Sequence, residues 1–322
     1  MSTTLPVTVV TGFLGAGKTT LVNRWLGDAR RGDVAVIVNE QGAVGIDGEL
    51  LAARARVLVE IAGGCICCTT QAELVRALDQ LASSESPPAR ILVETSGAAS
   101  PAGVLRAIAR GGPESTFALD GVITVVDASR VNRLLEHELA LEQIGCADLV
   151  LLSHADRCTA DALTRARSWV EAQNGVAVVV EAAAGHVVLP GVDGSLERLL
   201  ALRRSGFSGP ERRPRTTTAH VYESVSLSLD GELHEERFAA FMEDELARFA
   251  GRIFRTKGIL AVAGLAQRLI VQGVTDSVEI ELGEPWADSP RRSRLVVVGF
   301  GLDRDALERS FAGCAATPDE AT

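Results

Sequence analysis

The sequence predicts an α/β protein with a doubly wound, mainly parallel sheet, followed by a second, smaller α+β domain. Three observations predict this fold class. Short β-branched runs alternate with helical patterns up to about residue 200. These runs are almost continuously apolar, which is typical of strands buried on both faces of a parallel sheet. After a polar stretch, the order changes to strands in series with two helices.

The first domain is expected over residues 1–202. Its apolar runs predict strands at 7–10, 34–38, 57–61, 91–94, 122–126, 149–152 and 176–180. Apolar residues recur at helical spacing between them, at 19–26, 71–81, 104–109, 131–144 and 161–172. Strand and helix in alternation form the repeating unit of an open parallel sheet.

Residues 203–216 are rich in Gly, Pro, Ser and Arg and predict a linker. Their arginines are also compatible with an anion-binding patch, although a solvated hinge is favoured. The second domain is expected over 217–314 and a flexible tail over 315–322. The elements predicted there are strands at 221–229, 259–262, 269–271, 278–280 and 295–300, and helices at 235–250 and 304–311.

Composition excludes several function classes. With 42 acidic and 32 basic side chains, the net charge of -10 opposes binding to nucleic acids or anionic membranes. No apolar run approaches the ~18 to 20 residues of a membrane helix, and the first residues lack a signal-peptide pattern. We therefore expect a cytoplasmic protein that binds neither nucleic acid nor membrane. Six cysteines are too few for a disulfide scaffold in this length.

The segment from Gly12 to Thr19 fits the pattern G-x-x-x-x-G-K-[ST], after the first strand and at the start of the first helix. This is a P-loop, and it makes the first domain a P-loop NTPase fold. Backbone N–H groups turn toward the phosphates, Lys18 reaches the β and γ oxygens, and the Thr19 hydroxyl ligates Mg²⁺. The predicted nucleotide-binding residues here are Gly12, Gly15, Ala16, Gly17, Lys18, Thr19 and Thr20. A ligand-free glycine turn is disfavoured, since Lys18 is one of only two lysines.

Glu94 ends the strand at 91–94 and is the expected second Mg²⁺ carboxylate. Lys18 and Glu94 are thus the predicted catalytic residues. Gly97, three residues later, allows the backbone to respond to a γ-phosphate. Asp127 ends the next strand. It is interpreted either as a hydrogen-bonded loop residue, which is favoured, or as a second polar group in the cleft.

Three cysteines, Cys65, Cys67 and Cys68, follow two glycines in a C-x-C-C cluster. The helix behind them lowers thiol pKa values toward the metal-binding thiolate. Three soft ligands select Zn²⁺, Co²⁺ or Cu(I), and they are one short of a closed structural zinc site. Glu40, after the second strand, is a candidate oxygen ligand, and all these groups should share one sheet edge with the P-loop. A redox-active thiol pair and inert buried cysteines are the alternatives.

The P-loop, N-E-x-G, G-G-C-I-C-C and E-T-S-G segments, in this order, resemble those of the CobW-type metallochaperones. That branch of P-loop GTPases also holds the hydrogenase and urease nickel-insertion GTPases. In the second domain, 255–260 (RTKGIL) resembles the R-x-K-G-[IL] strand of the family. The resemblance implies that GTP hydrolysis, with Mg²⁺, is coupled to delivery of Zn²⁺ or Co²⁺ to a client metalloprotein. Cys65, Cys67, Cys68 and Glu40 would hold the metal, and 42–47 would act as a switch.

The sequence departs from the family at the base-reading motif N-K-x-D, where it has Ser153-His154-Ala155-Asp156. Asp156 retains the acceptor for guanine N1 and N2 hydrogens, and His154 is placed to stack on the base. Ser153 lacks the asparagine amide, a loss of about 1 to 3 kcal/mol that weakens guanine preference. His154 and Cys158 stand four apart, as helix-borne metal ligands do, but a base-site or surface histidine is favoured.

Two further departures concern metal handling. Gln41 and Ala43 stand where the family often has an aromatic residue and a carboxylate. The histidines are scattered at 137, 154, 186, 220 and 234, which excludes bulk zinc buffering. Two alternative functions stay open: a P-loop phosphotransferase of a small metabolite with a structural zinc site, and a metal-responsive nucleotide-binding regulator. In the GTPase interpretations the second domain would recognise the partner through an exposed strand edge.

Overall fold

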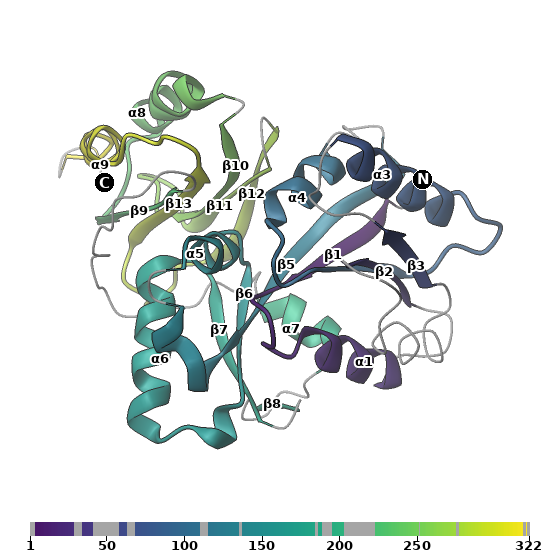
Figure 1. Ribbon diagram of the computed structural model, residues 1–322. Coiled ribbons are helices and arrows are strands. Elements are labelled where there is room, and N and C mark those ends of the chain that lie inside the picture. Colours follow the sequence, from purple (N-terminus) through teal and green to yellow (C-terminus); the bar gives the residue numbers. More distant parts are fainter. Residues whose placement is uncertain are drawn as a thin grey trace. The chain divides into compact units, whose positions relative to one another are not determined.

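The structure is a computed structural model (Figure 1). It describes residues 4–28, 34–40, 58–62, 68–109, 115–134, 137–183, 186–188, 195–202, 223–250, 252–274, 277–317 and 320. Two compact units are present: unit 1 contains Met1–Arg167 and Val178–Ala201, and unit 2 contains Ser168–Ala177 and Leu202–Thr322. The expected linker at 203–216 lies outside the described residues, so its boundaries stay a prediction.

Unit 1 is built on an eight-stranded sheet of order β3-β2-β4-β1-β5-β6-β7-β8. All neighbours run parallel except the last pair, β7 and β8. The central strand β1 is buried on both faces, as its apolar run predicts. The strands are β1 (Leu5–Thr11), β2 (Val34–Glu40), β3 (Leu58–Ala62), β4 (Arg90–Thr95), β5 (Phe117–Asp127), β6 (Leu149–Ser153), β7 (Val178–Ala183) and β8 (His186–Val188).

Helices cover both faces of this sheet, which confirms the predicted doubly wound fold. In Figure 1, α3 and α4 lie on one face and α1 and α7 on the other. The helices are α1 (Lys18–Asp28), α3 (Cys68–Ala82), α4 (Pro101–Ala109), α5 (Glu138–Gly145), α6 (Ala160–Gln173) and α7 (Leu196–Leu202), with short 3₁₀ turns η1 (Ala128–Arg133) and η2 (Ala155–Arg157). Within the described residues, none of these helices is long and apolar enough to cross a membrane.

The single helix predicted at 131–144 is wrong, because η1 ends at Arg133 and α5 begins at Glu138. The Asp127 carboxylate accepts from the Ser129 N–H and starts η1 directly after β5. A helical segment therefore starts ten residues earlier than α5 and stops after two turns. The prediction also missed β8 and α7, which are too short to show a clear period in the sequence.

Unit 2 contains a five-stranded antiparallel sheet of order β12-β11-β10-β13-β9. Its strands are β9 (Glu223–Asp230), β10 (Ile253–Leu260), β11 (Gln267–Val274), β12 (Ser277–Pro285) and β13 (Arg292–Gly299). Its helical segments after β9 are α8 (Glu235–Ala240), the π-helical η3 (Phe241–Leu246), η4 (Ala247–Phe249) and α9 (Arg304–Ala312). The predicted small α+β architecture is confirmed.

Aromatic side chains from the helical segments form the core of unit 2 against one sheet face. Phe241 and Phe311 meet edge to face at 5.5 Å between ring centroids. The predicted helix at 235–250 is continuous but changes type, because Phe241 and Leu246 both reach this core although they are five residues apart. A π turn, with its i to i+5 bonding, keeps two such residues on one face.

Part of the segment expected to be a flexible tail contacts the helical layer of unit 2. Ala315 forms a bridge with Leu233. Arg237 on α8 donates to the Ala315 carbonyl at 2.6 Å and to both carboxylate oxygens of Glu320, at 2.8 and 3.0 Å.

We predict that Gly258→Ala destabilises the protein by on the order of 1 to 3 kcal/mol. A Cβ at this position in β10 would lie 2.6 Å from Leu295 Cδ1 and 3.1 Å from the Arg294 carbonyl oxygen. Leu295 is fully buried and has little room to move. Urea denaturation of the variant measures the change. Gly175→Ala is the control, since a Cβ there meets only a contact of 3.7 Å, and an equal loss in both variants would contradict the packing argument.

Candidate functional site

The P-loop connects the end of β1 to the start of α1 and is shaped by three glycines with positive φ. These are Gly12 (137°), Gly15 (73°) and Gly17 (96°). A Cβ at Gly12 would lie 2.1 Å from the Val125 carbonyl oxygen of β5, so only glycine allows the loop to leave the sheet at this point. The loop curls around its own lysine: the buried Lys18 ammonium donates to the Gly12 carbonyl at 2.9 Å.

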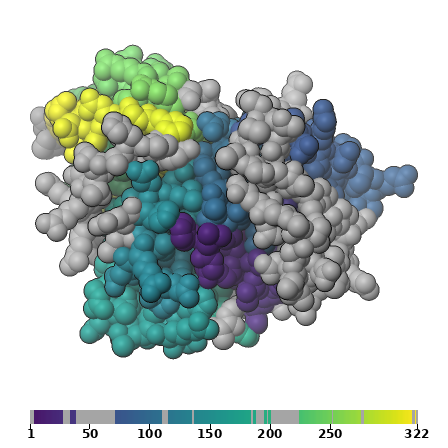
Figure 2. All heavy atoms as spheres, in the orientation of Figure 1, coloured from purple at the N-terminus to yellow at the C-terminus, as the bar shows by residue number. Residues whose placement is uncertain are grey.

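The tip of the P-loop lies at the surface of unit 1. Leu14, at the loop tip, is 60% exposed, and Gly15 and Thr20 are also exposed, whereas Ala16 is buried. Figure 2 shows the purple segment that includes this loop reaching the surface beside teal residues of the same unit. The loop sits beyond the carboxyl ends of parallel strands, where open α/β sheets bind their ligands.

Glu94 and Thr19 lie together, as the sequence predicts. Glu94 pairs with Val10 in the register of β4 and β1, so its side chain stands next to the strand that feeds the P-loop. The Thr19 hydroxyl donates to Glu94 Oε1 at 2.6 Å, and Glu94 is only 5% exposed. A hydroxyl and a carboxylate are hard oxygen donors of the kind that Mg²⁺ prefers. The two side chains therefore fit a magnesium ion beside the phosphates.

The loop after β4 packs directly on the P-loop. A Cβ on Gly97 would lie 2.7 Å from the Leu14 nitrogen and 2.8 Å from the Leu14 Cα, so the two backbones are in contact. The Gln143 side chain from α5 holds the other side of this loop and donates to the Ala99 carbonyl at 3.2 Å. Thr124 of β5 donates to the Gln143 carbonyl at 2.6 Å and fixes α5 in turn. Direct contacts thus join the P-loop, the segment that follows Glu94 and α5.

The residue before Gln143, Glu142, has no signal in the sequence, because a charged residue in an amphipathic helix normally faces solvent. Its side chain is 2% exposed and accepts a hydrogen bond from Ser100. Burial raises the pKa of Glu142 to about 7, against the lowering effect of the hydrogen bonds from Ser100 and the Ala102 N–H and of the Arg106 charge. Its Oε2 atom has no hydrogen-bond partner in the described part of the chain. The carboxyl is therefore adapted to the neutral form.

Ser153 ties the end of β6 to the P-loop. Its hydroxyl lies 2.7 Å from the Ala16 carbonyl oxygen and 3.3 Å from the Val126 carbonyl oxygen. A serine hydroxyl has one proton, and the shorter contact assigns that proton to Ala16. No donor of Ser153 then remains for a nucleobase, which agrees with the expectation that this position does not reproduce an asparagine amide.

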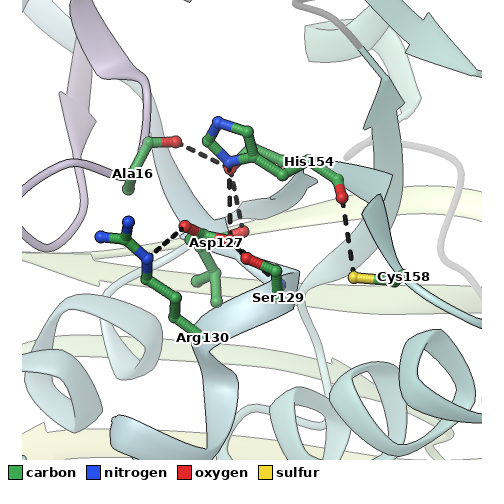
Figure 3. A network of polar contacts seen from close by, with 8 residues as sticks. Ala16, Asp127, Ser129, Arg130, His154 and Cys158 are labelled. Atoms are coloured by element: carbon green, nitrogen blue, oxygen red, sulfur yellow. Dashed lines mark hydrogen bonds and ion pairs between the residues drawn. The ribbon is translucent and has the colours of Figure 1, made fainter. Parts of the chain in front are cut away.

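His154 adopts a left-handed backbone conformation, with φ 56° and ψ 32°. Its Nδ1 atom lies 3.1 Å from Ser153 Oγ and 3.5 Å from Asp127 Oδ1 (Figure 3). Since the serine proton goes to Ala16 and the carboxylate only accepts, we assign a proton to Nδ1 of His154. In the neutral ring, Nε2 is then an acceptor, and Figure 3 shows it turned away from this network.

Asp127 joins the network from the end of β5, and its contacts fit the interpretation as a hydrogen-bonded loop residue. Its Oδ1 accepts from the Ser129 N–H at 2.9 Å and the Ser129 hydroxyl at 2.6 Å. Arg130 Nε lies 3.4 Å from its Oδ2, and Figure 3 shows this guanidinium on the P-loop side of the carboxylate. A Cβ on Gly15 would lie 3.7 Å from Arg130 Nη1. Arg130 is thus a second cation at the P-loop, one that no motif in the sequence indicates.

The contacts of His154 and Cys158 disfavour the metal-ligand interpretation of this pair. Cys158 Sγ donates to the His154 carbonyl at 3.6 Å, and burial, with the charges of Asp127 and Asp156, raises the pKa of the thiol. Raising the pKa of a thiol reduces the thiolate form that binds metals. No cluster of three metal-binding residue types occurs among the residues that the structure describes. Asp156 itself is exposed on η2.

The predicted thiolate site lies mostly outside the described residues. These omit Cys65, Cys67 and the segment 41–57, and they include Cys68 and Glu40 only as backbone, at the start of α3 and the end of β2. The described backbone places only the strands that flank this segment. Glu40 pairs with Ala62 at the carboxyl ends of two parallel strands, and β2 is also the neighbour of β4. β2 and β3 therefore end at the same sheet edge as β4, which carries Glu94.

The fold and this site define the class of protein: a P-loop nucleotide-binding protein with a separate antiparallel domain. The CobW/HypB/UreG nucleotide-binding domain family matches residues 6–181, and the cobalamin synthesis protein CobW C-terminal domain family matches residues 222–315. This chain belongs to the CobW/HypB/UreG family.

Related proteins are similar along nearly their whole length. A protein named zinc chaperone CobW, from Pseudomonas aeruginosa, is 36% identical over 94% of this chain and 89% of its own. Zinc chaperone YjiA from Escherichia coli is 30% identical over 96% of this chain and 98% of its own. The crystal structure of Zn(II)-bound YjiA GTPase from E. coli superimposes with a TM-score of 0.63 at 25% identity, covering 98% of this chain and 100% of that one.

Glu142→Gln is expected to change how stability depends on pH. The folded-state pKa of about 7 exceeds the ordinary value of 4.5, so the protonated carboxyl favours folding. Its contribution is fully present below about pH 4.5 and is lost as the pH rises through 7. The wild type should lose on the order of 3 kcal/mol of unfolding free energy over this range relative to the variant. Urea denaturation at several pH values measures this loss. The exposed Glu73→Gln is the control, and parallel pH curves for wild type and Glu142→Gln would contradict the assignment.

Proposed function

We propose that this protein is a GTP-dependent metallochaperone. It binds Zn²⁺ or Co²⁺ at the C-x-C-C loop and couples GTP hydrolysis to the delivery of the metal to, or the activation of, a client metalloprotein. By family it is a P-loop GTPase. The observation that carries the proposal is the direct backbone contact between Gly97 and Leu14, because it joins the phosphate loop to the sheet edge at which the metal loop begins.

GTP and Mg²⁺ would bind at the P-loop, where four side chains are suitably placed. Lys18 would exchange its contact with the Gly12 carbonyl for the β and γ oxygens of GTP. Arg130 adds a second positive charge on the exposed side of the loop. Thr19 and Glu94 would hold Mg²⁺, which neutralises phosphate charge when bound, and Glu94 would also orient the attacking water.

The metal is cargo, and its proposed ligands are Cys65, Cys67, Cys68 and Glu40. Three thiolates and one carboxylate suit Zn²⁺ or Co²⁺, and the carboxylate is the weakest of the four ligands for a soft ion. Two relatives are named zinc chaperones, which favours Zn²⁺ as the ion. A three-thiolate set that lacks a permanent fourth soft ligand is suited to release.

The proposed coupling between nucleotide and metal uses the contacts around the P-loop. Binding of GTP with Mg²⁺ would engage Thr19 and Glu94, and would thereby affect the loop from Glu94 to Ala99. This loop contacts Leu14 and accepts a hydrogen bond from Gln143. We infer that this movement, with the switch segment at 42–47, changes the arrangement of Glu40 relative to the thiolates. Reciprocity requires that bound metal then changes nucleotide affinity by the same factor.

The test measures Zn²⁺ and Co²⁺ affinity by competition with a chromophoric chelator. The states compared are nucleotide-free protein and its complexes with Mg-GDP, a non-hydrolysable GTP analogue and the matching ATP analogue. We expect a shift of tenfold or more with the GTP analogue, about 1.4 kcal/mol of coupling. Cys67→Ser with Cys68→Ser should abolish tight zinc binding and leave GTP binding intact, whereas Cys158→Ser should leave both intact.

Two outcomes would contradict the proposal. Zinc affinity that survives the double serine change would remove the thiolate site. Zinc affinity that is equal in all nucleotide states would leave a P-loop enzyme with a structural metal, and the phosphotransferase alternative would then be the better description.

Asp156→Asn should weaken binding of the GTP analogue by tenfold or more and leave binding of the ATP analogue unchanged. The exposed carboxylate on η2 is the proposed acceptor for the guanine N1 and N2 hydrogens, and an amide cannot accept both. Asp161→Asn, an exposed carboxylate in the first turn of α6, is the matched control. Isothermal titration calorimetry provides both affinities, and an equal loss for the two nucleotides would show that Asp156 does not read the base.

A further inference from the structure

Strand β12 is an edge strand of the sheet in unit 2. Among the described residues it pairs only with β11, from Ser277 opposite Val274 to Pro285 opposite Gln267. The outer side of such a strand presents N–H and C=O groups with no ladder partner. Natural edge strands are normally protected against pairing by charged side chains, especially lysine, by proline, by β-bulges or by short length. β12 is nine residues long, has its proline and a register shift against β11 only near its end, and contains no lysine or arginine. Its charged side chains are all glutamates, which oppose pairing with an acidic strand but not with a basic one.

One face of β12 is apolar and exposed. The described part of the chain has four exposed large hydrophobic residues. They are Leu14 and three residues of β12, namely Val278, Ile280 and Leu282, which are 43%, 54% and 59% exposed. Three of these alternate along β12 and therefore share one face. Ile280 lies opposite Val271, which is fully buried in the core beneath the helical layer. The apolar surface of that sheet face thus continues past the helices and onto the edge.

The other face of β12 is acidic. Glu279 and Glu281 alternate with the apolar residues, and both are exposed. On the neighbouring strand, Gln272 lies opposite Glu279 and donates to Glu281 at 3.1 Å. The strand therefore offers unpaired backbone at its rim, apolar side chains on one side and carboxylates on the other.

A complementary occupant must match all three features. A helix laid on the apolar face would leave the rim and the carboxylates uncovered. A second copy of β12, paired antiparallel about Ile280, would bring Glu279 opposite Glu281 of the other copy, and like charges in direct opposition are destabilising. A strand with alternating apolar and basic residues would form all three kinds of contact: backbone hydrogen bonds with the edge, apolar packing on one face and ion pairs with the glutamates on the other.

We propose that the outer edge of β12 is a docking site for an extended segment of a partner protein, in which apolar residues alternate with Lys or Arg. The segment adds a sixth strand to the sheet of unit 2. The identity of the partner as the client rests on the proposed function. Strand addition itself depends on neither GTP nor metal, so the two can be tested separately.

The test uses the full-length protein and a fluorescein-labelled peptide of nine residues, the length of β12, with alternating valine and lysine. Fluorescence anisotropy is recorded without nucleotide or metal. We expect saturable binding that is at least tenfold tighter than for two controls: an alternating valine and glutamate peptide, and a peptide of the same valine and lysine composition with the lysines grouped at one end. Equal binding of the grouped peptide would overturn the proposal, since it would show attraction by net charge alone.

Variants locate the site. Ile280→Asn with Leu282→Asn, and separately Glu279→Gln with Glu281→Gln, should each weaken binding at least tenfold. The matched control is Glu235→Gln with Glu236→Gln, two exposed acidic residues on α8. A similar loss in this control, or full binding in the Asn variant, would contradict the assignment to β12.

Two further measurements complete the design. All variants should retain the wild-type melting temperature, GTP hydrolysis and zinc affinity, so that a failure of the metallochaperone proposal stays distinct from a failure of docking. Sedimentation equilibrium tests whether a second copy of this chain occupies the edge of β12 instead. A wild-type dimer that becomes a monomer in the Asn variant would overturn the proposal and show that the edge pairs copies of this chain.

Discussion

The nucleotide site depends on two places where backbone meets backbone without room for a side chain. Gly12 passes so close to Val125 of β5 that a methyl group would overlap the carbonyl oxygen, and Gly97 touches the main chain at Leu14. These contacts set the P-loop between β4 and β5 and hold it near the segment that follows Glu94. Because protein interiors are close-packed and hardly compressible, direct backbone contacts of this kind can pass on strain without intervening side chains.

Three polar residues surround the P-loop, one at the end of each of three strands. Glu94 at the end of β4 meets Thr19, Asp127 at the end of β5 organises η1 and Arg130, and Ser153 at the end of β6 meets Ala16. Each is buried or nearly so, and each bonds to the P-loop or to a residue beside it. The parallel sheet brings them together because all its strands in this region end at the same edge.

Much of the fold and part of the site could be predicted from the sequence. Continuous apolar runs predicted the strands of unit 1, because strands that are buried on both faces have apolar residues at nearly every position. The P-loop and the place of Glu94 at the end of β4 follow from fixed motif spacing, whereas the hydrogen bond from Ser153 to Ala16 was not predicted. Glu142, Gln143 and Arg130 could not be found this way, because their roles come from tertiary packing that has no local signature. The start of η1 depends on a side-chain cap at Asp127, and the π turn depends on which residues the core of unit 2 accepts.

The bond from Ser153 to Ala16 gives the site a property of its own. The segment proposed to read the base and the phosphate loop share this hydrogen bond, so a displacement of one changes the contacts of the other. The turn at His154 adopts a left-handed conformation, and the ring of His154 lies beside Asp127. On the proposed function, recognition of the base and recognition of the phosphates are therefore linked through the Ser153 hydroxyl.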